Sequence, residues 1–255
     1  MIDYEYVKDV VVSVKEIFMK TVKDSEVHYK GLFNIVTDCD IAVQKLITNK
    51  LKEKYPDIEM IAEELDQDRI VDKNKSYFVL DPIDGTINFR YGLNHSAISL
   101  GYVEKGQVVY GIVYNPYNDE IFEGYVGKGA FLNGKRIYGN KTNTLEESVV
   151  GFGIAPFNKD SAKELFDTVY RIFMKSLEIR RLGAASLDMC YVACGRLDAY
   201  IEKDLKIWDI AAGYLIAKES DIEVLNYSGK QFDTIQHSGV IVANKNLVKE
   251  LLDTM

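Results

Sequence analysis

The sequence lacks the features of secreted, disulfide-stabilised and membrane-spanning proteins. It has only three cysteines in 255 residues, an odd number, and Cys190 and Cys194 resemble residues of a helix face rather than a metal-binding pair. No charged N-terminal segment is followed by an apolar run, and no run of about 18 apolar residues occurs along the chain. We therefore expect a cytoplasmic protein that does not span a membrane.

The chain also has fewer basic than acidic residues, 31 Lys and Arg against 39 Asp and Glu. The formal net charge is -8 and no basic stripe offsets it, so the surface would repel the phosphates of a nucleic acid. Hydrophobic residues make up 47% of the chain, which is ample for a folded core. The length fits one large domain or two small ones that pack closely. We expect a globular protein with no nucleic-acid partner.

The residues that suggest chemistry are concentrated in the stretch from Val79 to Phe89. An apolar run up to Leu80 predicts a buried strand, and the turn-forming residues after it predict that the strand ends at Asp81. Asp81 and Asp84 would then leave the sheet edge close together, and two such carboxylates repel each other unless a cation lies between them. The pattern indicates either a cation site or ordinary Asp-Pro and Asp-Gly turns.

The cation that best suits these ligands is Mg²⁺. It prefers hard oxygen ligands, commonly one or two carboxylates, with water and phosphate oxygens in the remaining positions. The carbonyl of Ile83 could be a further ligand, because Pro82 restricts the backbone beside it. A helix that begins here would direct the N–H groups of Gly85 and Thr86 at an anion. A metal on one side and a helix terminus on the other describe a phosphate site.

Three separated motifs resemble those of one family. Asp-Pro-Ile-Asp-Gly-Thr after a hydrophobic strand is similar to the signature of the inositol monophosphatase family of Mg²⁺-dependent, lithium-sensitive phosphatases. Val-Thr-x-x-Asp ending at Asp40, and Trp208-Asp209 followed by Ile-Ala-Ala, look like two further motifs of that family. The resemblance extends from Lys30 to Asn244. It implies a layered α/β (α+β) fold with the order α-β-α-β-α, and a homodimer.

The resemblance also implies a role for each residue of the site. The ligands of two or three Mg²⁺ ions would be Glu63, Asp81, Ile83, Asp84 and Asp209. The catalytic residues around the attacking water would be Asp40, Glu63 and Thr86. The substrate-binding residues would be Asp84, Gly85, Thr86, Gly183, Ala184, Ala185, Glu202 and Asp209. Ala184 departs from the threonine often found at its position in the family, which leaves the identity of the bound alcohol open.

Each of these residues also has a structural explanation. Asp40 and Asp209 begin predicted helices, where a carboxylate can cap free N–H groups or interact with the helix dipole. Glu63 starts a Glu-Glu pair after a strand, and such pairs are usually solvated. Gly183 and Glu202 fit turn and packing roles. Residue type alone therefore leaves both explanations open.

The polar stretch from Gly139 to Glu147 is the best candidate for a boundary. It separates residues 1–145, an N-terminal α+β half with most of the metal ligands, from residues 146–255. The second half alternates strands and helices and would complete the metal and substrate site. In the first half the pattern predicts one helix through Tyr6 to Phe18, an irregular polar segment from Thr21 to Phe33, and a loop from Gln67 to Ser76.

The expected function is that of a Mg²⁺-dependent phosphomonoesterase that hydrolyses a small polyol phosphate with metal-activated water. Myo-inositol 1-phosphate is the first expectation. Fructose 1,6-bisphosphate, NADP(H) and 3'-phosphoadenosine 5'-phosphate are alternatives, because similar motifs serve their phosphatases. The non-enzymatic alternative is a metal-dependent binding or regulatory protein. Intact Asp40, Glu63 and Thr86 argue against it, since a pure binder needs no water-orienting group.

Overall fold

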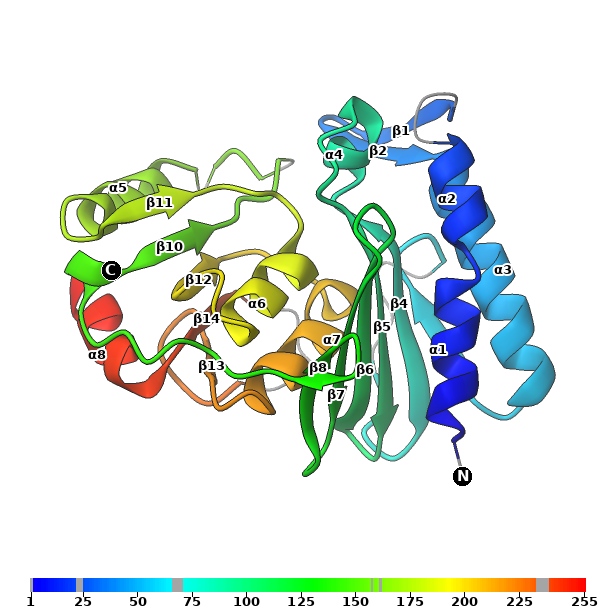
Figure 1. Ribbon diagram of the computed structural model, residues 1–255. Helices are drawn as coiled ribbons and strands as arrows, with labels where there is room; N and C mark the ends of the chain where they lie inside the picture. The colour runs from blue at the N-terminus through cyan, green and yellow to red at the C-terminus, as the bar shows by residue number, and fades with distance from the viewer. Residues whose placement is uncertain (1, 22–24, 66–70, 157, 161, 233–238) are drawn as a thin grey trace.

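Three layers of helices alternate with two β-sheets (Figure 1). The computed structural model describes residues 2–21, 25–65, 71–156, 158–160, 162–232 and 239–255. The layered α-β-α-β-α fold predicted from the sequence is confirmed. Among the described residues, none of the helices combines the length and the apolar character needed to cross a membrane.

The first helical layer covers the outer face of the larger sheet. It consists of α1 (Tyr4–Val12), α2 (Lys15–Thr21) and α3 (Asp38–Lys54). The prediction of a single helix from Tyr6 to Phe18 was wrong. The helix is interrupted at Ser13, whose hydroxyl donates to the carbonyl of Val10 at 2.8 Å. Serine side chains often compete in this way with the hydrogen bonds of a helix. Val14 and Phe18 remain buried, so both short helices present one apolar face to the core.

The larger sheet has seven strands. In spatial order they are β3 (Glu59–Ala62), β4 (Ser76–Asp84), β5 (Ala97–Glu104), β6 (Gln107–Asn115), β7 (Glu120–Tyr125), β8 (Gly129–Leu132) and β9 (Lys135–Arg136). Only β3 and β4 run parallel, with Ala62 opposite Leu80. Because the two strands run in the same direction, the next residues, Glu63 and Asp81, lie side by side where β3 ends.

Strand β4 continues through the segment that was predicted to end it. Asp81 pairs with Ser99 and Asp84 pairs with Ala97, and the register shifts between them. Pro82 cannot donate a ladder hydrogen bond, and a bulge is where a sheet tolerates such a residue. The irregularity therefore turns the acidic segment without ending the strand.

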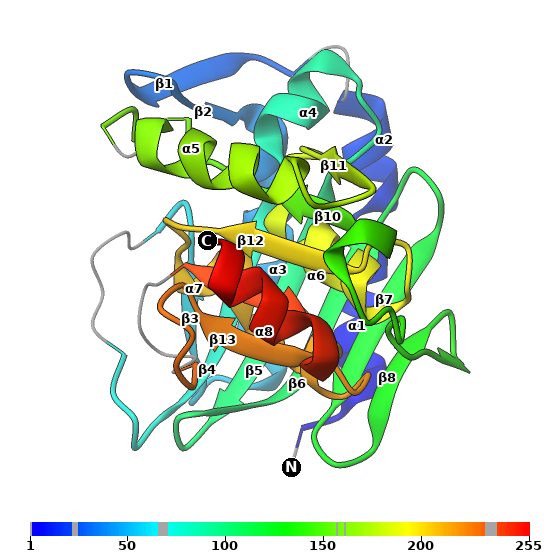
Figure 2. The ribbon, with the colours of Figure 1, turned by 90° about the vertical axis from the view of Figure 1, so that its left-hand side faces the viewer.

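The smaller sheet has five strands. Their spatial order is β11 (Glu178–Arg180), β10 (Val149–Phe152), β12 (Ala199–Glu202), β14 (Val240–Ala243) and β13 (Glu223–Asn226). Helices α6 (Ala185–Ala193) and α7 (Ile207–Lys218) lie between the two sheets, and α5 (Ala162–Phe173) and α8 (Lys245–Thr254) cover the far side (Figures 1 and 2). Strand and helix types in this half agree with the sequence prediction, with ends shifted by a few residues.

Glycines let α7 lie directly on the larger sheet. A Cβ added at Gly101 would be 2.9 Å from the Cβ of Ala211, and one at Gly111 would be 2.9 Å from the Cα of Ala212. Only a sheet without side chains at these points admits the helix so closely. This packing fixes the start of α7, and with it Asp209, relative to the larger sheet.

Three further elements complete the chain. They are the hairpin of β1 (Val27–Gly31) and β2 (Asn34–Thr37), the short helix α4 (Thr86–Tyr91), and a 3-10 turn at Leu145–Glu147. The hairpin replaces most of the irregular segment predicted from Thr21 to Phe33, while α4 begins after Gly85 as predicted. Part of the predicted loop from Gln67 to Ser76, residues 67–70, lies outside the described residues.

The division at residue 145 stays a proposal. The strands of the two sheets fall in residues 59–136 and 149–243. However, one hydrophobic cluster joins Val113 and Phe122 of the larger sheet to Met189 and Ile216 of the central helices. The two halves therefore share a core.

Candidate active site

A pocket lies where the first half of the chain meets the second. Its lining comes from the β1–β2 hairpin, the ends of β3 and β4, α4, the segment after β10, the start of α6, and the residues from the end of β12 to α7. Ten of the residues predicted for the site line it: Glu63, Asp81, Ile83, Asp84, Gly85, Thr86, Gly183, Ala185, Glu202 and Asp209. The segments that carry the sequence motifs therefore meet at one place.

Two predicted residues lie behind the pocket wall. Asp40 is fully buried and reaches the pocket only through Thr86, whose hydroxyl lies 3.4 Å from Asp40 Oδ1. Ala184 is also buried, and its Cβ would be 3.0 Å from a Cβ added at Gly85. The side chain of Ala184 thus packs beneath Gly85 and does not line the pocket.

Asp81 and Ile83 form a tight turn at the end of β4. The Asp81 Oδ1 accepts from the backbone N–H of Ile83 at 3.0 Å, and the Ile83 carbonyl accepts from the hydroxyl of Thr86 at 3.1 Å. Burial raises the pKa of Asp81 well above its usual range, and the charges of Glu63 and Asp84 raise it further. A cation near Asp81 would relieve this repulsion.

Asp84 caps a helix from the other half of the chain. Its Oδ2 accepts from the backbone N–H of Ser186 at 2.7 Å and from the Ser186 hydroxyl at 2.5 Å, and Oδ1 accepts from the Ala185 N–H at 3.2 Å. The N-cap residue of α6, Ala184, has no side chain to do this. Burial raises the pKa of Asp84 to about 6, although the Ser186 bonds oppose the shift.

Sequence reasoning missed Ser186. The available signal was a helix that begins Ala184-Ala185, because two alanines leave its first N–H groups without a side-chain acceptor. Such a helix requires an acceptor from elsewhere, and here a carboxylate of the acidic loop supplies it. The hydroxyl of Ser186, the residue after the alanines, donates a further hydrogen bond to the same carboxylate.

Asp40 and Asp209 are helix caps and also face the site. Asp40 Oδ2 accepts from the N–H and the hydroxyl of Thr37, at 2.8 and 2.5 Å, in a capping box at the start of α3. Asp209 Oδ2 accepts from the Lys206 N–H at 2.7 Å at the start of α7. Burial is the main cause that raises the pKa of Asp40 to about 7 and that of Asp209 well above its usual range. The structural explanation left open by the sequence is correct. Asp209 also lines the pocket, and the second oxygen of Asp40 lies 3.4 Å from the hydroxyl of Thr86.

Glu63 has a cationic neighbour that the sequence did not identify. The ammonium of Lys30, in β1, lies 3.1 Å from Glu63 Oε1 and also contacts Glu64. Burial lowers the pKa of Lys30, but the two glutamates outweigh burial and the net shift is upward. The hairpin thus places one positive charge beside the acidic residues.

Glu202 lies on the opposite wall. It accepts a hydrogen bond from the hydroxyl of Tyr200, and burial raises its pKa to about 8. Gly153 gives it room, because a Cβ at that position would lie 2.0 Å from Glu202 Oε2. Arg181 is the one positively charged residue among those that line the pocket in the described part of the chain.

The chemistry of these donors suits a hard divalent cation, although the group of described side chains whose ligand atoms lie within 4.8 Å of one another is Glu26, His28 and Asp38 at the surface. Four carboxylates and one backbone carbonyl, all oxygen ligands, converge on one pocket, and the lining gathers far more negative than positive charge. At the same place, Gly85 begins α4 with a φ of +83°, and no side chain caps that helix. The first N–H groups of α4 are therefore open to an anion.

Comparison with known proteins identifies the family of the chain. A model of the inositol monophosphatase family matches residues 2–254. An inositol-1-monophosphatase of Caulobacter vibrioides is 31% identical over 236 residues, 92% of each chain. A Nus factor SuhB of Escherichia coli is 33% identical, covering 90% of this chain and 85% of that protein. A fructose-1,6-bisphosphatase/inositol-1-monophosphatase of Thermotoga maritima is 38% identical, covering 79% of this chain and 75% of that protein.

Solved structures share the whole fold. The extragenic suppressor protein suhB of Bartonella henselae superposes with a TM-score of 0.91 at 29% identity, covering 98% of this chain and 97% of that chain. An IMPase/NADP phosphatase complexed with Mg²⁺ and phosphate superposes with a TM-score of 0.85 at 26% identity, covering 95% and 90% of the two chains. The fold and the acidic pocket are those of a phosphoric monoester hydrolase. The chain belongs to the inositol monophosphatase family.

Proposed function

We propose that this protein is a Mg²⁺-dependent phosphomonoesterase that hydrolyses a small polyol phosphate, with myo-inositol 1-phosphate as its first candidate substrate. The observation that carries the proposal is the convergence of Glu63, Asp81, Asp84 and Asp209 on one pocket. Burial raises the pKa of the three aspartates, which is the expected state of a cation site without its cation.

The metal ligands divide into two overlapping sets. Glu63, Asp81 and the Ile83 carbonyl would hold one cation, and Asp81, Asp84 and Asp209 a second. A third would bind near Glu63, where Lys30 now pairs with that side chain. Bound divalent cations supply two kinds of chemistry: they lower the pKa of a coordinated water and stabilise a departing alkoxide. Binding at a weak position would also explain inhibition by Li⁺.

Thr86 and Asp40 would orient the attacking water. Thr37 occupies Asp40 Oδ2, which leaves Oδ1 directed at the Thr86 hydroxyl 3.4 Å away. An Asp40 carboxylate can accept the Thr86 proton, so that Thr86 Oγ1 accepts a proton from the water. Because the pKa of Asp40 is raised to about 7, its charge depends on the occupancy of the site.

The start of α4 would hold the phosphate, and the opposite wall the alcohol. The N–H groups of Gly85 and Thr86 are the donors for the phosphate oxygens. Gly183, Ala185 and Glu202 line the pocket from the second half of the chain and would contact the hydroxyls of the substrate. The buried Ala184 would act through its packing against Gly85.

One observation favours a second candidate class of substrate. Arg181 lines the pocket, and its guanidinium makes a long hydrogen bond of 3.5 Å to the Ile154 carbonyl and interacts electrostatically with Glu202. A guanidinium with open donors suits a second phosphate. Fructose 1,6-bisphosphate, NADP(H) and 3'-phosphoadenosine 5'-phosphate all carry one.

A phosphate-release panel tests the proposal. Inositol 1-phosphate and the three alternatives are supplied with Mg²⁺, with a chelator, and with Mg²⁺ plus Li⁺. We expect release from at least one ester that requires Mg²⁺ and is reduced by Li⁺. Release from none of the esters would favour the alternative of a metal-dependent binding or regulatory protein. Binding of a nucleic acid would then be tested first, against the prediction that there is no such partner, because several relatives carry the name Nus factor.

We also propose a homodimer in the cytoplasm. Helix α5 and the turn after it expose a row of large apolar side chains spaced three and four residues apart: Phe166, Tyr170, Phe173, Met174 and Leu177. Figure 2 shows α5 on the side of the molecule that faces away from the larger sheet. An apolar stripe of this kind on a surface helix suits contact with another protein surface.

A further inference from the structure

A buried contact between a histidine and a carboxylate crosses between the two halves of the chain behind the pocket. His95 Nε2 lies 3.0 Å from Asp188 Oδ1, and the two side chains are 13% and 1% exposed. His95 precedes β5 of the larger sheet, and Asp188 lies in α6. Neither residue lines the pocket, so the pair does not contact a bound substrate.

Both ends of this pair belong to segments that hold the acidic loop. On the His95 side, the His95 carbonyl accepts from the Asn88 amide at 2.8 Å, and the hydroxyl of Ser96 donates to the Gly85 carbonyl at 2.9 Å. The same Asn88 amide donates across the halves to the Leu182 carbonyl at 2.7 Å. The segment at 95–96 therefore supports Gly85 from behind.

On the other side, α6 holds Asp84 directly. The N–H groups of Ala185 and Ser186 bind the Asp84 carboxylate, and Asp188 follows in the same turn of the helix. Burial raises the pKa of Asp188, and the hydrogen bond with His95 opposes that shift. The Asp188 N–H donates to the Ala184 carbonyl at 2.9 Å, while Oδ2 has no hydrogen-bond partner among the described residues. Asp188 is thus tied to His95 through its side chain and to the start of the helix that Asp84 caps through its backbone.

We propose that the His95–Asp188 pair is a positioning device for Asp84: it holds α6 against the 95–96 segment, so that the Asp84 carboxylate stays bound to Ala185 and Ser186 while the remaining lone pairs of its oxygens are presented to a divalent cation. The inference rests on the proposed function, because it takes Asp84 as a metal ligand. Partners that orient a ligand in this way commonly change metal affinity about 10- to 100-fold when removed.

The test compares substitutions that remove or keep the bond. His95→Leu removes the donor, and His95→Gln keeps a side-chain N–H for Asp188. Mg²⁺ binding is measured by calorimetry, and the Mg²⁺ dependence of phosphate release and the melting temperature are measured in parallel. We expect the Mg²⁺ dissociation constant to rise at least about tenfold in His95→Leu and to return close to the wild-type value in His95→Gln.

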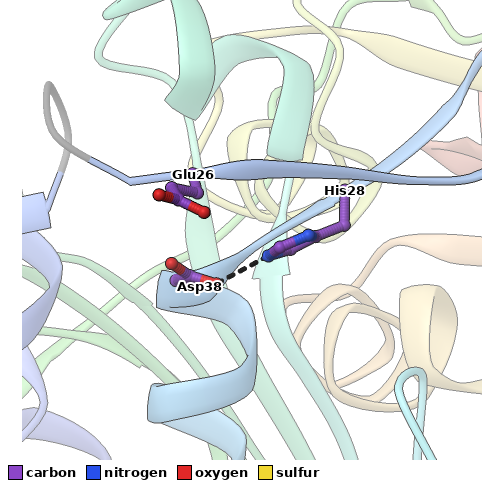
Figure 3. Close-up of side chains that lie close together, drawn as sticks. All are labelled: Glu26, His28 and Asp38. Carbon is purple, nitrogen blue, oxygen red and sulfur yellow. Dashed lines mark hydrogen bonds and ion pairs between the residues drawn. The ribbon is translucent and has the colours of Figure 1, made fainter.

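The chain offers a matched control at the surface. His28 Nε2 lies 2.7 Å from Asp38 Oδ1 with both side chains about half exposed, and Figure 3 shows Glu26 beside them. His28→Leu removes a pair of the same chemistry that does not touch the acidic loop. The ligand atoms of Glu26, His28 and Asp38 lie within 4.8 Å of one another, so this surface group can itself take a cation. The control is therefore measured by the Mg²⁺ dependence of phosphate release, which we expect to match that of the wild type.

Each outcome decides the proposal. Unchanged Mg²⁺ affinity in His95→Leu with a lower melting temperature would assign the pair a purely structural role, and equal effects of Leu and Gln would show that the bond is irrelevant. If His95→Leu does not fold, His95→Asn, which is polar but too short to span the distance, takes its place. A wild-type protein that binds Mg²⁺ but releases no phosphate would refute the proposed function and leave this test valid. A wild-type protein that binds no Mg²⁺ would overturn both.

Discussion

Three aspartates of the pocket share one arrangement. Asp40, Asp84 and Asp209 each give a carboxylate oxygen to the free N–H groups at the start of a helix, respectively α3, α6 and α7. The positive ends of three helices therefore face the same acidic group, and their partial charges offset part of its repulsion. At the residue scale, capping and metal binding are compatible because each of the two carboxylate oxygens has more than one lone pair.

Asp84→Asn separates the two roles of Asp84, as helix cap and as proposed metal ligand. The amide oxygen can still accept from Ser186, so we expect the helix cap and the fold to survive. The loss of charge should reduce Mg²⁺-dependent phosphate release to below about a hundredth of the wild-type rate. Release assays and thermal melts check this, with the exposed Asp38→Asn as control. Near-normal turnover in Asp84→Asn would refute the metal assignment.

The raised pKa values predict how stability responds to pH. Burial raises the pKa of Asp84 to about 6, of Asp40 to about 7 and of Glu202 to about 8, from ordinary values near 4. Between the ordinary and the raised pKa of each group, the metal-free folded state binds more protons than the unfolded state. The contribution of these three groups to the free energy of unfolding therefore falls as the pH rises from about 4 to about 8.

Mg²⁺ binds the deprotonated carboxylates and should reverse this loss. We expect the rise in melting temperature on adding Mg²⁺ to be larger at about pH 8 than at about pH 5. Scanning calorimetry of the chelated and Mg²⁺-loaded protein at both pH values measures it. An equal rise at the two values would mean that these carboxylates do not hold the ion.

At the scale of elements, the placement of α7 depends on the bare surface of the larger sheet. Gly111→Ala would place a Cβ 2.9 Å from backbone atoms of Ala212, so that the helix carrying Asp209 has to move. We expect a loss of about 1–3 kcal/mol in the free energy of unfolding and reduced Mg²⁺ affinity. Chemical denaturation and calorimetry measure the two effects.

Gly31→Ala is the control for this change, because nothing lies within 4 Å of a Cβ at that position. If Gly111→Ala is as stable as Gly31→Ala and binds Mg²⁺ normally, close packing of α7 on the sheet does not set the position of Asp209. Another contact would then have to fix the position of Asp209 relative to the larger sheet.

The sequence predicted the elements whose pattern is local and missed those set by distant partners. Strand β4 and helices α3, α6 and α7 follow from apolar periodicity and turn residues. The β1–β2 hairpin was missed because its exposed Tyr29 and Leu32 and its polar residues carry no core-facing alternation. The hairpin is held by the pairing of β1 with β2 and by the contact of Lys30 with Glu63, and no local sequence pattern encodes that contact.

The site residues divide in the same way. Asp81, Asp84 and Asp209 stand in specific motifs, so their convergence could be predicted. Ser186 and His95 act through partners about a hundred residues away in the sequence, and nothing in their own surroundings marks them. The burial of Ala184 likewise depends on its packing against Gly85, which only the fold brings close.

At the scale of the whole molecule, the exposed row on α5 predicts self-association. We expect light scattering to give about twice the 29.0 kDa chain mass for the wild type, and the chain mass for Tyr170→Glu, which places a charge in the row. Tyr29→Glu, on the equally exposed hairpin, is the control. A wild-type monomer, or a dimer unaffected by Tyr170→Glu, would contradict this assignment.

The two halves meet at a pocket to which each contributes acidic ligands, and the account depends on cations being bound there. The most direct measurement is an anomalous difference map from crystals soaked with Mn²⁺ and phosphate. The account predicts metal peaks within ligand distance of Asp81, Asp84 and Asp209 and of Glu63, with phosphate at the start of α4. A map without metal at these carboxylates, from crystals of protein that hydrolyses its substrate, would contradict it.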